Sequence, residues 1–249
     1  MGIENINQFI RSMELQREKI PSFSEFPFCL SAVRDLTELK LHPKVTFIIG
    51  ENGTGKSTIL EALATAYGFN PEGGTKNFNF SSMDTHSNLH NYIRIAKGIR
   101  KPKNGFFLRA ESFYNVATNI DELDKEEGGP KIIDSYGGKS LHQQSHGESF
   151  LSLFINKFGE EGIYILDEPE AALSPMRQMT MLSRIHELVQ QGSQFIIATH
   201  SPIIMAYPDA LIYEIKEDIK IVKYEETEHY QVMRNFLTRT PKMLEILMK

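Results

Sequence analysis

The sequence predicts one α/β domain built around a mostly parallel sheet. Three short runs of β-branched and aromatic residues, VTFII at 45–49, IYIL at 163–166 and FIIA at 195–198, are typical of strands buried on both faces. Between these runs, residues 57–67 and 176–190 carry apolar side chains three and four positions apart, which predicts crossover helices. We therefore expect residues 1–249 to form a single domain of this class.

The composition supports a folded protein in a reducing compartment. Hydrophobic residues make up 41% of the chain and charged residues 24%, close to the averages of globular domains. The net charge of -5 argues against a molecule covered by positive potential, although a local basic patch remains compatible with it. The single cysteine, Cys29, cannot form an internal disulfide, which favours a cytoplasmic location. The opening residues lack the pattern of a signal peptide, and no apolar run approaches the roughly 18 to 20 residues of a membrane span, so we expect no membrane insertion.

The remaining segments are expected to decorate this core. Residues 68–160 read as a helical and irregular insertion between core strands, with a helix around 89–98 and a surface loop or short helices at 121–138. Beyond Pro208, ALIYEI and IKIVKY flank a charged turn and predict a hairpin, and residues 228–249 predict closing helices. The C-terminal part, 209–249, is thus a hairpin followed by helices.

A phosphate-binding loop is predicted directly after the first core strand. GENGTGKS at 50–57 fits the Walker A pattern, in which glycines let backbone amides turn towards phosphates and a helix N-terminus adds its positive end. Lys56 is expected to reach the β- and γ-phosphates, and Ser57 to bind Mg²⁺. The alternative is a chance match in a glycine-rich turn. The expected nucleotide-binding residues are Gly50, Glu51, Asn52, Gly53, Thr54, Gly55, Lys56, Ser57 and Thr58.

Polar residues follow the other two core strands at the edge where α/β sheets place their ligands. In IYILDEPE, Asp167 is expected to hold Mg²⁺, and Glu168 to polarise the water that attacks the γ-phosphate. An acidic turn after a core strand is the alternative. In FIIATHSP, His200 is expected to contact the γ-phosphate, although a lone histidine at a strand end is more often only a satisfied polar residue.

The order of these motifs carries a family resemblance. Walker A, SHGES, DEPEAALS and ATH follow one another as in the ATP-binding-cassette (ABC) ATPases, which this chain resembles over nearly its whole length. The family signature, usually L-S-G-G-Q, corresponds to Gln144–Glu148, so Ser145, His146, Gly147 and Glu148 are expected to contact ATP bound to another subunit. A capping box between Ser145 and Glu148 is an alternative that uses the same helix end.

Other positions follow from the same resemblance. Ala171, Ala172, Leu173 and Ser174 fall on the D-loop, which in the family runs along the dimer interface; an ordinary helix start before Pro175 is the alternative. No glutamine stands at the Q-loop, so Glu111 is our candidate, with Arg109 nearby. Phe26 and Phe28 are candidates for the aromatic that stacks on adenine, but we expect core packing for both.

The motif variants indicate a branch of the family. His146, Glu148 and DEPE lean away from transporters, and the chain resembles soluble stand-alone predicted ABC-type ATPases of the AAA family, similar to the ATPase parts of OLD-type, RecF-like and SMC-like proteins. This implies a P-loop NTPase fold, ATP and Mg²⁺ as cofactors, Mg²⁺-dependent ATP hydrolysis, and a head-to-tail homodimer that acts as an ATP-driven switch for a protein partner. DNA maintenance or defence is the suggested setting. The alternatives are the ATP-binding subunit of a membrane ABC transporter and a P-loop kinase.

One basic run is not explained by these motifs. Its five cations, all within ten residues, are Arg94, Lys97, Arg100, Lys101 and Lys103. A solvated helix face is the favoured interpretation. Binding of nucleic-acid phosphates, or of an acidic partner, is the alternative.

Overall fold

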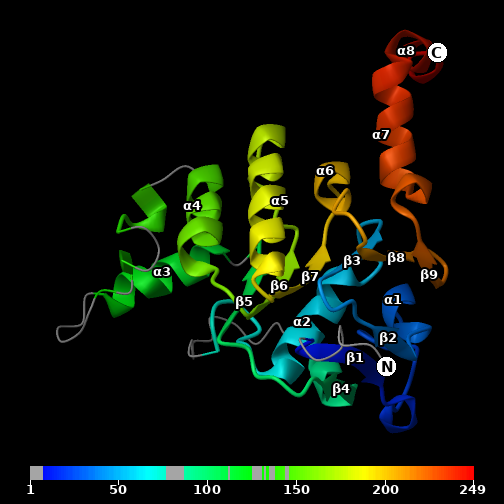
Figure 1. Cartoon of the computed structure of the whole chain (residues 1–249). Helices are drawn as coiled ribbons and strands as arrows, with labels where there is room; N and C mark the ends of the chain where they lie inside the picture. The colour runs from blue at the N-terminus through cyan, green and yellow to red at the C-terminus, as the bar shows by residue number, and fades with distance from the viewer. Residues whose placement is uncertain are drawn as a thin grey trace.

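The core of the protein is a six-stranded sheet in which five strands are parallel (Figure 1). The computed structural model describes residues 8–76, 87–111, 113–124, 131, 133–134, 138–143 and 146–249. The sheet order is β5 (Asn104–Arg109), β6 (Gly162–Asp167), β7 (Gln194–Ala198), β3 (Val45–Gly50), β8 (Leu211–Ile215) and β9 (Ile219–Val222). Only β9 is antiparallel, to β8, and these two strands form the predicted hairpin.

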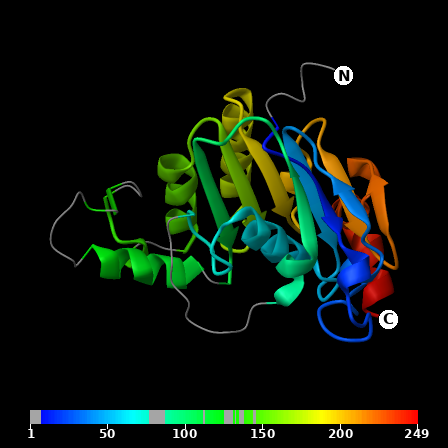
Figure 2. The ribbon, with the colours of Figure 1, turned by 90° about the horizontal axis from the view of Figure 1, so that it is seen from below.

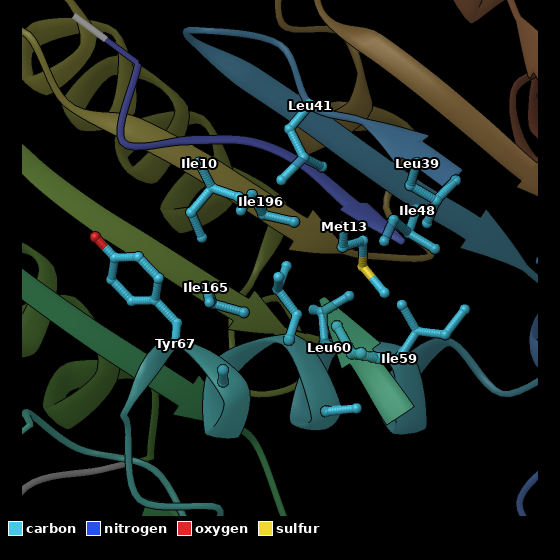
Figure 3. Close-up of a cluster of buried hydrophobic side chains, with 14 of the residues drawn as sticks. Ile10, Met13, Leu39, Leu41, Ile48, Ile59, Leu60, Tyr67, Ile165 and Ile196 are labelled. Carbon is cyan, nitrogen blue, oxygen red and sulfur yellow. The ribbon is translucent and has the colours of Figure 1, made fainter. Parts of the chain in front are cut away.

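A second, antiparallel sheet lies on one side of this core. It has the order β2 (Glu38–Lys40), β1 (Ile10–Leu15) and β4 (Ile93–Lys97). The helix α2 (Lys56–Tyr67) shares one hydrophobic cluster with both sheets, and Figure 3 shows side chains from all three pointing into this common interior. The opposite face of the main sheet packs against α4 (His146–Ser152), α5 (Pro175–Gln190) and α6 (Pro202–Met205). The helix α3 (Phe113–Leu123) lies beyond the β5 edge of the sheet and contributes to the same hydrophobic cluster (Figure 2).

Successive side chains of each core strand point to opposite faces of the main sheet. In β3, Phe47 and Ile49 belong to the cluster under α5, whereas Ile48 belongs to the cluster under α2. Because both faces are covered, every residue of β3, β6 and β7 is buried, which explains their continuous apolar sequences. The predicted strands and the two long crossover helices are therefore confirmed.

Three further helices have different surroundings. The single-turn helix α1 (Ser31–Arg34) lies against α2. At the C-terminus, α7 (Glu228–Thr238) and α8 (Thr240–Leu247) pack on each other, and neither contains a buried residue. Both project away from the rest of the molecule (Figure 1).

The prediction of a helix around 89–98 is wrong. Residues Asn88–Tyr92 form a short 3-10 helix, and β4 follows it because Ile93 and Ile95 pair with Leu15 and Met13 of β1. Tertiary pairing with a remote strand thus overrides the local periodicity.

The basic run consequently lies on β4 and the following loop, not on a helix face. Arg94 lies 3.5 Å from Glu14, and Arg100 lies 2.9 Å from Glu161. Lys103 contacts both Glu160 and Glu161. Three of the five cations are therefore next to carboxylates of the same chain.

One buried side chain ties the two sheets together. Gln194, fully buried at the start of β7, accepts hydrogen bonds from the amides of Phe9 and Ile10 through Oε1, both at 3.0 Å. Its Nε2 donates to the carbonyls of Ile10, at 2.8 Å, and His42, at 3.0 Å. Backbone groups next to the small sheet thus find their partners on the main sheet.

We predict that Gln194→Leu lowers the free energy of unfolding by about 2 to 4 kcal/mol, because it leaves several buried backbone groups without partners. Gln194→Glu should also destabilise the fold, since a carboxylate cannot donate to the two carbonyls. Urea denaturation measures both, with the exposed Gln190→Leu on α5 as the control. Equal stabilities of Gln194→Leu and Gln190→Leu would contradict this account.

Candidate nucleotide-binding site

The predicted phosphate loop connects the end of β3 to the start of α2, at the edge where β6 and β7 also end. Gly55, immediately before α2, has φ 102°, a left-handed conformation that favours glycine. At Gly50 a Cβ atom would lie 2.5 Å from the carbonyl oxygen of Ile215, so only glycine fits beside β8. The glycines of the motif therefore have steric reasons to be there.

Lys56 places its charge inside this loop. Its side chain is buried, and Nζ donates to the carbonyls of Gly50 and Glu51, each at 2.8 Å. Burial lowers the pKa of this ammonium, while the carboxylates of Glu168 and Asp167 act in the opposite direction. The loop thus holds a buried cation that faces the acidic end of β6.

Ser57 and Asp167 meet across the sheet edge. The hydroxyl of Ser57 donates to Oδ1 of Asp167 at 3.1 Å, although the two residues are 110 positions apart. Only 5% of Asp167 is exposed, and burial raises the pKa of its carboxyl to about 7 despite the Ser57 hydrogen bond. A buried carboxylate next to a hydroxyl supplies two hard oxygen ligands, so these residues fit a Mg²⁺ ion.

Larger metal-binding clusters do not occur among the described residues. No group of three or more His, Cys, Asp or Glu side chains there is arranged to hold a metal. A cation at Ser57 and Asp167 would therefore complete its shell with water and ligand oxygens, as Mg²⁺ does in phosphate sites.

Glu168 is in a strained backbone conformation. Its φ is 50°, and its amide donates to the carbonyl of Ala198 at 2.9 Å. A left-handed conformation at a non-glycine residue costs on the order of 1 to 3 kcal/mol and is common at functional sites. The turn gives the Glu168 side chain access to the cavity beside the phosphate loop.

That cavity has a volume of about 420 Å³. Its lining combines the loop with residues from three other segments, namely Phe26, Leu30, Asn52, Gly53, Gly55, Lys56, Ser57, Thr58, Glu111 and Glu168. Six of the nine predicted loop residues and the predicted water-polarising carboxylate thus share one concave surface.

His200 lies at the end of β7, beside Glu168. Its Nε2 is 3.5 Å from Oε1 of Glu168, and its amide donates to the buried carboxylate of Glu170. On the other side of the ring, Nδ1 lies 3.0 Å from Nε2 of His229 in the first turn of α7. Sequence reasoning missed His229, because only the fold brings α7 to the end of β7.

The Q-loop and adenine candidates have different surroundings. Glu111 is exposed at the cavity, and Arg109 forms a 2.9 Å ion pair with Glu61 and lies 3.5 Å from Glu111. Phe28 is buried against Tyr92, as expected. For Phe26 the expectation of core packing is wrong: 65% of it is exposed, and it lines the cavity.

The described part of the signature stretch contacts the predicted D-loop. Gln144 and Ser145 lie outside the described residues, and α4 begins at His146. A Cβ on Gly147 would lie 2.7 Å from the carbonyl oxygen of Ala172 and 2.4 Å from Arg177. Glu148 lies 3.7 Å from Arg177. The start of α4 and the segment Ala171–Ser174 therefore pack as one unit within the chain.

None of the helices in the described ranges is both long and apolar enough to cross a membrane.

Comparisons with known proteins agree with this geometry. The family model described as "AAA domain" matches residues 3–228. The hemin import ATP-binding protein HmuV of Pseudomonas aeruginosa is 26% identical over 191 residues, which cover 70% of this chain and 74% of that protein. The cytochrome c biogenesis ATP-binding export protein CcmA of Legionella pneumophila is 26% identical over 160 residues, 62% and 78% of the two chains.

A solved structure shares the fold. A metal-chelate type ABC transporter in an inward-facing conformation superposes with a TM-score of 0.51 at 16% identity, covering 91% of this chain and 88% of that one. With the family model matching most of the sequence, the chain belongs to the AAA domain family, and its fold is that of the ABC-type ATPases.

Proposed function

We propose that this protein hydrolyses ATP and uses the ATP-bound state to close two copies of itself head to tail. The observation that carries the proposal is the meeting of Ser57 and Asp167, with Glu168 next in the chain and His200 3.5 Å from Glu168. A phosphate loop, a cation site and a carboxylate next to a histidine are the parts that phosphoryl transfer to water requires.

Each residue has a chemical task in this proposal. Lys56 and the loop amides bind the phosphates, and Ser57 and Asp167 hold Mg²⁺, which neutralises charge on the phosphate oxygens when it is bound. Glu168 accepts a hydrogen bond from the attacking water and polarises it. His200 donates from Nε2 to the γ-phosphate and thereby senses its presence.

The second copy supplies the other half of the site. In the proposal, Ser145, His146, Gly147 and Glu148 face the γ-phosphate of the partner's ATP, and Ala171–Ser174 follow the interface. Their support is the packing of Gly147 on Ala172, which couples the two predicted interface segments inside one chain. A movement of one segment at the interface is therefore passed to the other.

A transporter subunit is the second candidate. It is favoured by the curated relatives, HmuV and CcmA, whose names describe import and export ATP-binding proteins. The first candidate is favoured by the variant signature and by DEPE in this sequence. A partner protein receives the ATP signal in both proposals.

We predict that Glu168→Gln retains ATP binding but lowers the hydrolysis rate by about 10²-fold, because an amide cannot polarise water as a carboxylate does. Lys56→Ala should abolish tight ATP binding. Calorimetry measures binding and phosphate release measures turnover, with Glu217→Gln on the β8–β9 turn as the control. Wild-type protein that binds no ATP would overturn the proposal.

We predict that Asp167→Asn stabilises the Mg²⁺-free and nucleotide-free protein. The folded-state pKa of about 7 lies above the ordinary aspartate value of 3.8, so the folded protein loses stability as the pH rises between these values. The free energy of unfolding of Asp167→Asn should exceed that of the wild type by on the order of 2 kcal/mol at pH 8, and this difference should shrink towards pH 4. Thermal melting at both pH values checks this, with the exposed Asp218→Asn as the control; an equal gain at pH 4 and pH 8 would refute it.

We predict that Ser145→Arg leaves ATP affinity nearly unchanged but blocks dimerisation, because a bulky side chain would meet the partner's nucleotide. Sedimentation of Glu168→Gln with Mg-ATP should show a monomer-to-dimer shift that the added Ser145→Arg removes. Asn156→Arg, exposed beyond α4, is the matched control. Gly147 is unsuitable for this test, because a Cβ there meets Arg177 of the same chain. A dimer that persists with Ser145→Arg would contradict the head-to-tail arrangement.

A further inference from the structure

Two imidazole rings from distant elements meet behind the candidate catalytic carboxylate. Nδ1 of His200, at the end of β7, lies 3.0 Å from Nε2 of His229 in α7, and the ring centroids are 5.2 Å apart. The nitrogens at the far ends of this pair are both buried. Nδ1 of His229 has no hydrogen-bond partner among the described residues, whereas Nε2 of His200 faces Oε1 of Glu168 at 3.5 Å, an ion-pair contact and not a well-formed hydrogen bond. The contact therefore has two possible proton arrangements with different costs.

The surroundings of both rings favour the neutral imidazole over the charged one. Burial lowers the pKa of His200 and His229, and the ammonium of Lys56 lowers both further. Carboxylates act in the opposite direction, mainly Glu168 on His200 and Glu214 on His229. In two neutral rings, one nitrogen of the contact must donate and the other must accept.

The first arrangement has His200 as the donor. Nε2 of His200 would then carry a lone pair 3.5 Å from Oε1 of Glu168, so two acceptors would face each other. His229 would have to carry its proton on Nδ1, which would be a buried donor without a partner. Both features are unfavourable, because an orphaned buried donor loses the full free energy of its lost hydration.

The second arrangement has His229 as the donor. Its Nε2–H then points to Nδ1 of His200, and the proton of His200 is on Nε2, which faces Glu168. The unpartnered Nδ1 of His229 is then an acceptor, and no buried N–H is left facing nothing. This arrangement avoids both penalties of the first.

We propose that His229 is a positioning residue, which donates from Nε2 to His200 and holds that ring in the tautomer whose Nε2–H faces Glu168. An effect of His229 on ATP hydrolysis rests on the proposed role of His200. A His200 ring with a lone pair on Nε2 could not donate to a phosphate oxygen. The hydrogen bond made by one ring nitrogen fixes what the other can do.

The fold holds His229 in place independently of His200. Thr227, fully buried, caps α7 by accepting from the amide of Tyr230. The amide of Glu228 donates to Glu214 of β8 at 3.2 Å, and Lys216 lies 3.0 Å from the Glu228 carboxylate. His229 therefore sits on a fixed helix start, from which it can orient the His200 ring.

The decisive measurement is the ¹⁵N spectrum of the histidine rings in the wild-type protein without nucleotide. We expect His200 to be protonated on Nε2 and bare on Nδ1, and His229 to be protonated on Nε2. A proton on Nδ1 of His200 overturns the proposal. Because no ATP is present, this result is independent of whether the protein hydrolyses ATP.

Two variants test the consequence for turnover. His229→Phe keeps a ring but removes the donor, so kcat should fall about tenfold with little change in KM, as losses of a supporting hydrogen bond usually do. His229→Gln places an amide N–H near the position of Nε2 and should restore kcat close to the wild-type value.

The control is His186→Phe on α5, whose ring contacts Tyr207 away from this site, and its kcat should equal that of the wild type. If His229→Gln is as slow as His229→Phe while both retain the wild-type circular dichroism, the donor role is refuted. If His229→Phe does not fold, the proposal is still tested by the ¹⁵N spectrum of the wild type and by the kcat of His229→Gln.

Discussion

The site depends on one contact, between the hydroxyl of Ser57 and the buried carboxyl of Asp167. Neither residue could reach the other without the parallel order β6, β7, β3, which brings the ends of strands from remote parts of the chain to one edge. Burial disfavours the ionised carboxyl, as its raised pKa indicates. The sheet therefore holds the Asp167 carboxyl where a nearby cation would stabilise its ionised form, which water hardly reaches.

Local strain and close packing surround this contact. Gly50 lets β3 end against the backbone of Ile215, and the left-handed turn at Glu168 directs the next carboxylate towards the cavity. Such conformations persist only where the surrounding structure determines them, and here the covered faces of the sheet do so. The two hydrophobic clusters are thus the reason that a strained residue can be held beside the phosphate loop.

The parts of the fold that sequence could predict are those whose composition reflects their own burial. The covered faces of the sheet make β3, β6 and β7 apolar throughout, and the apolar spacing of α2 and α5 is helical. The positions of these five elements were therefore predicted to within a residue or two. β1, β2 and β4 are short and partly exposed, and their pairing is set by remote residues such as Gln194. In the site, the glycine loop and the strand ends carry local patterns, whereas His229 has none, because its partner is 29 residues away.

The position of α7 and α8 has a mechanical consequence. The base of α7 is attached through Thr227, Glu228 and His229 to the hairpin and to the end of β7, whereas neither helix contains a buried residue. Eleven helical residues span about 16 Å at 1.5 Å per residue. A tilt of about ten degrees at the base would therefore displace the far end of α7 by about 3 Å. In this geometry, a change in the contact between His229 and His200 that tilted the base of α7 would be amplified along the helix.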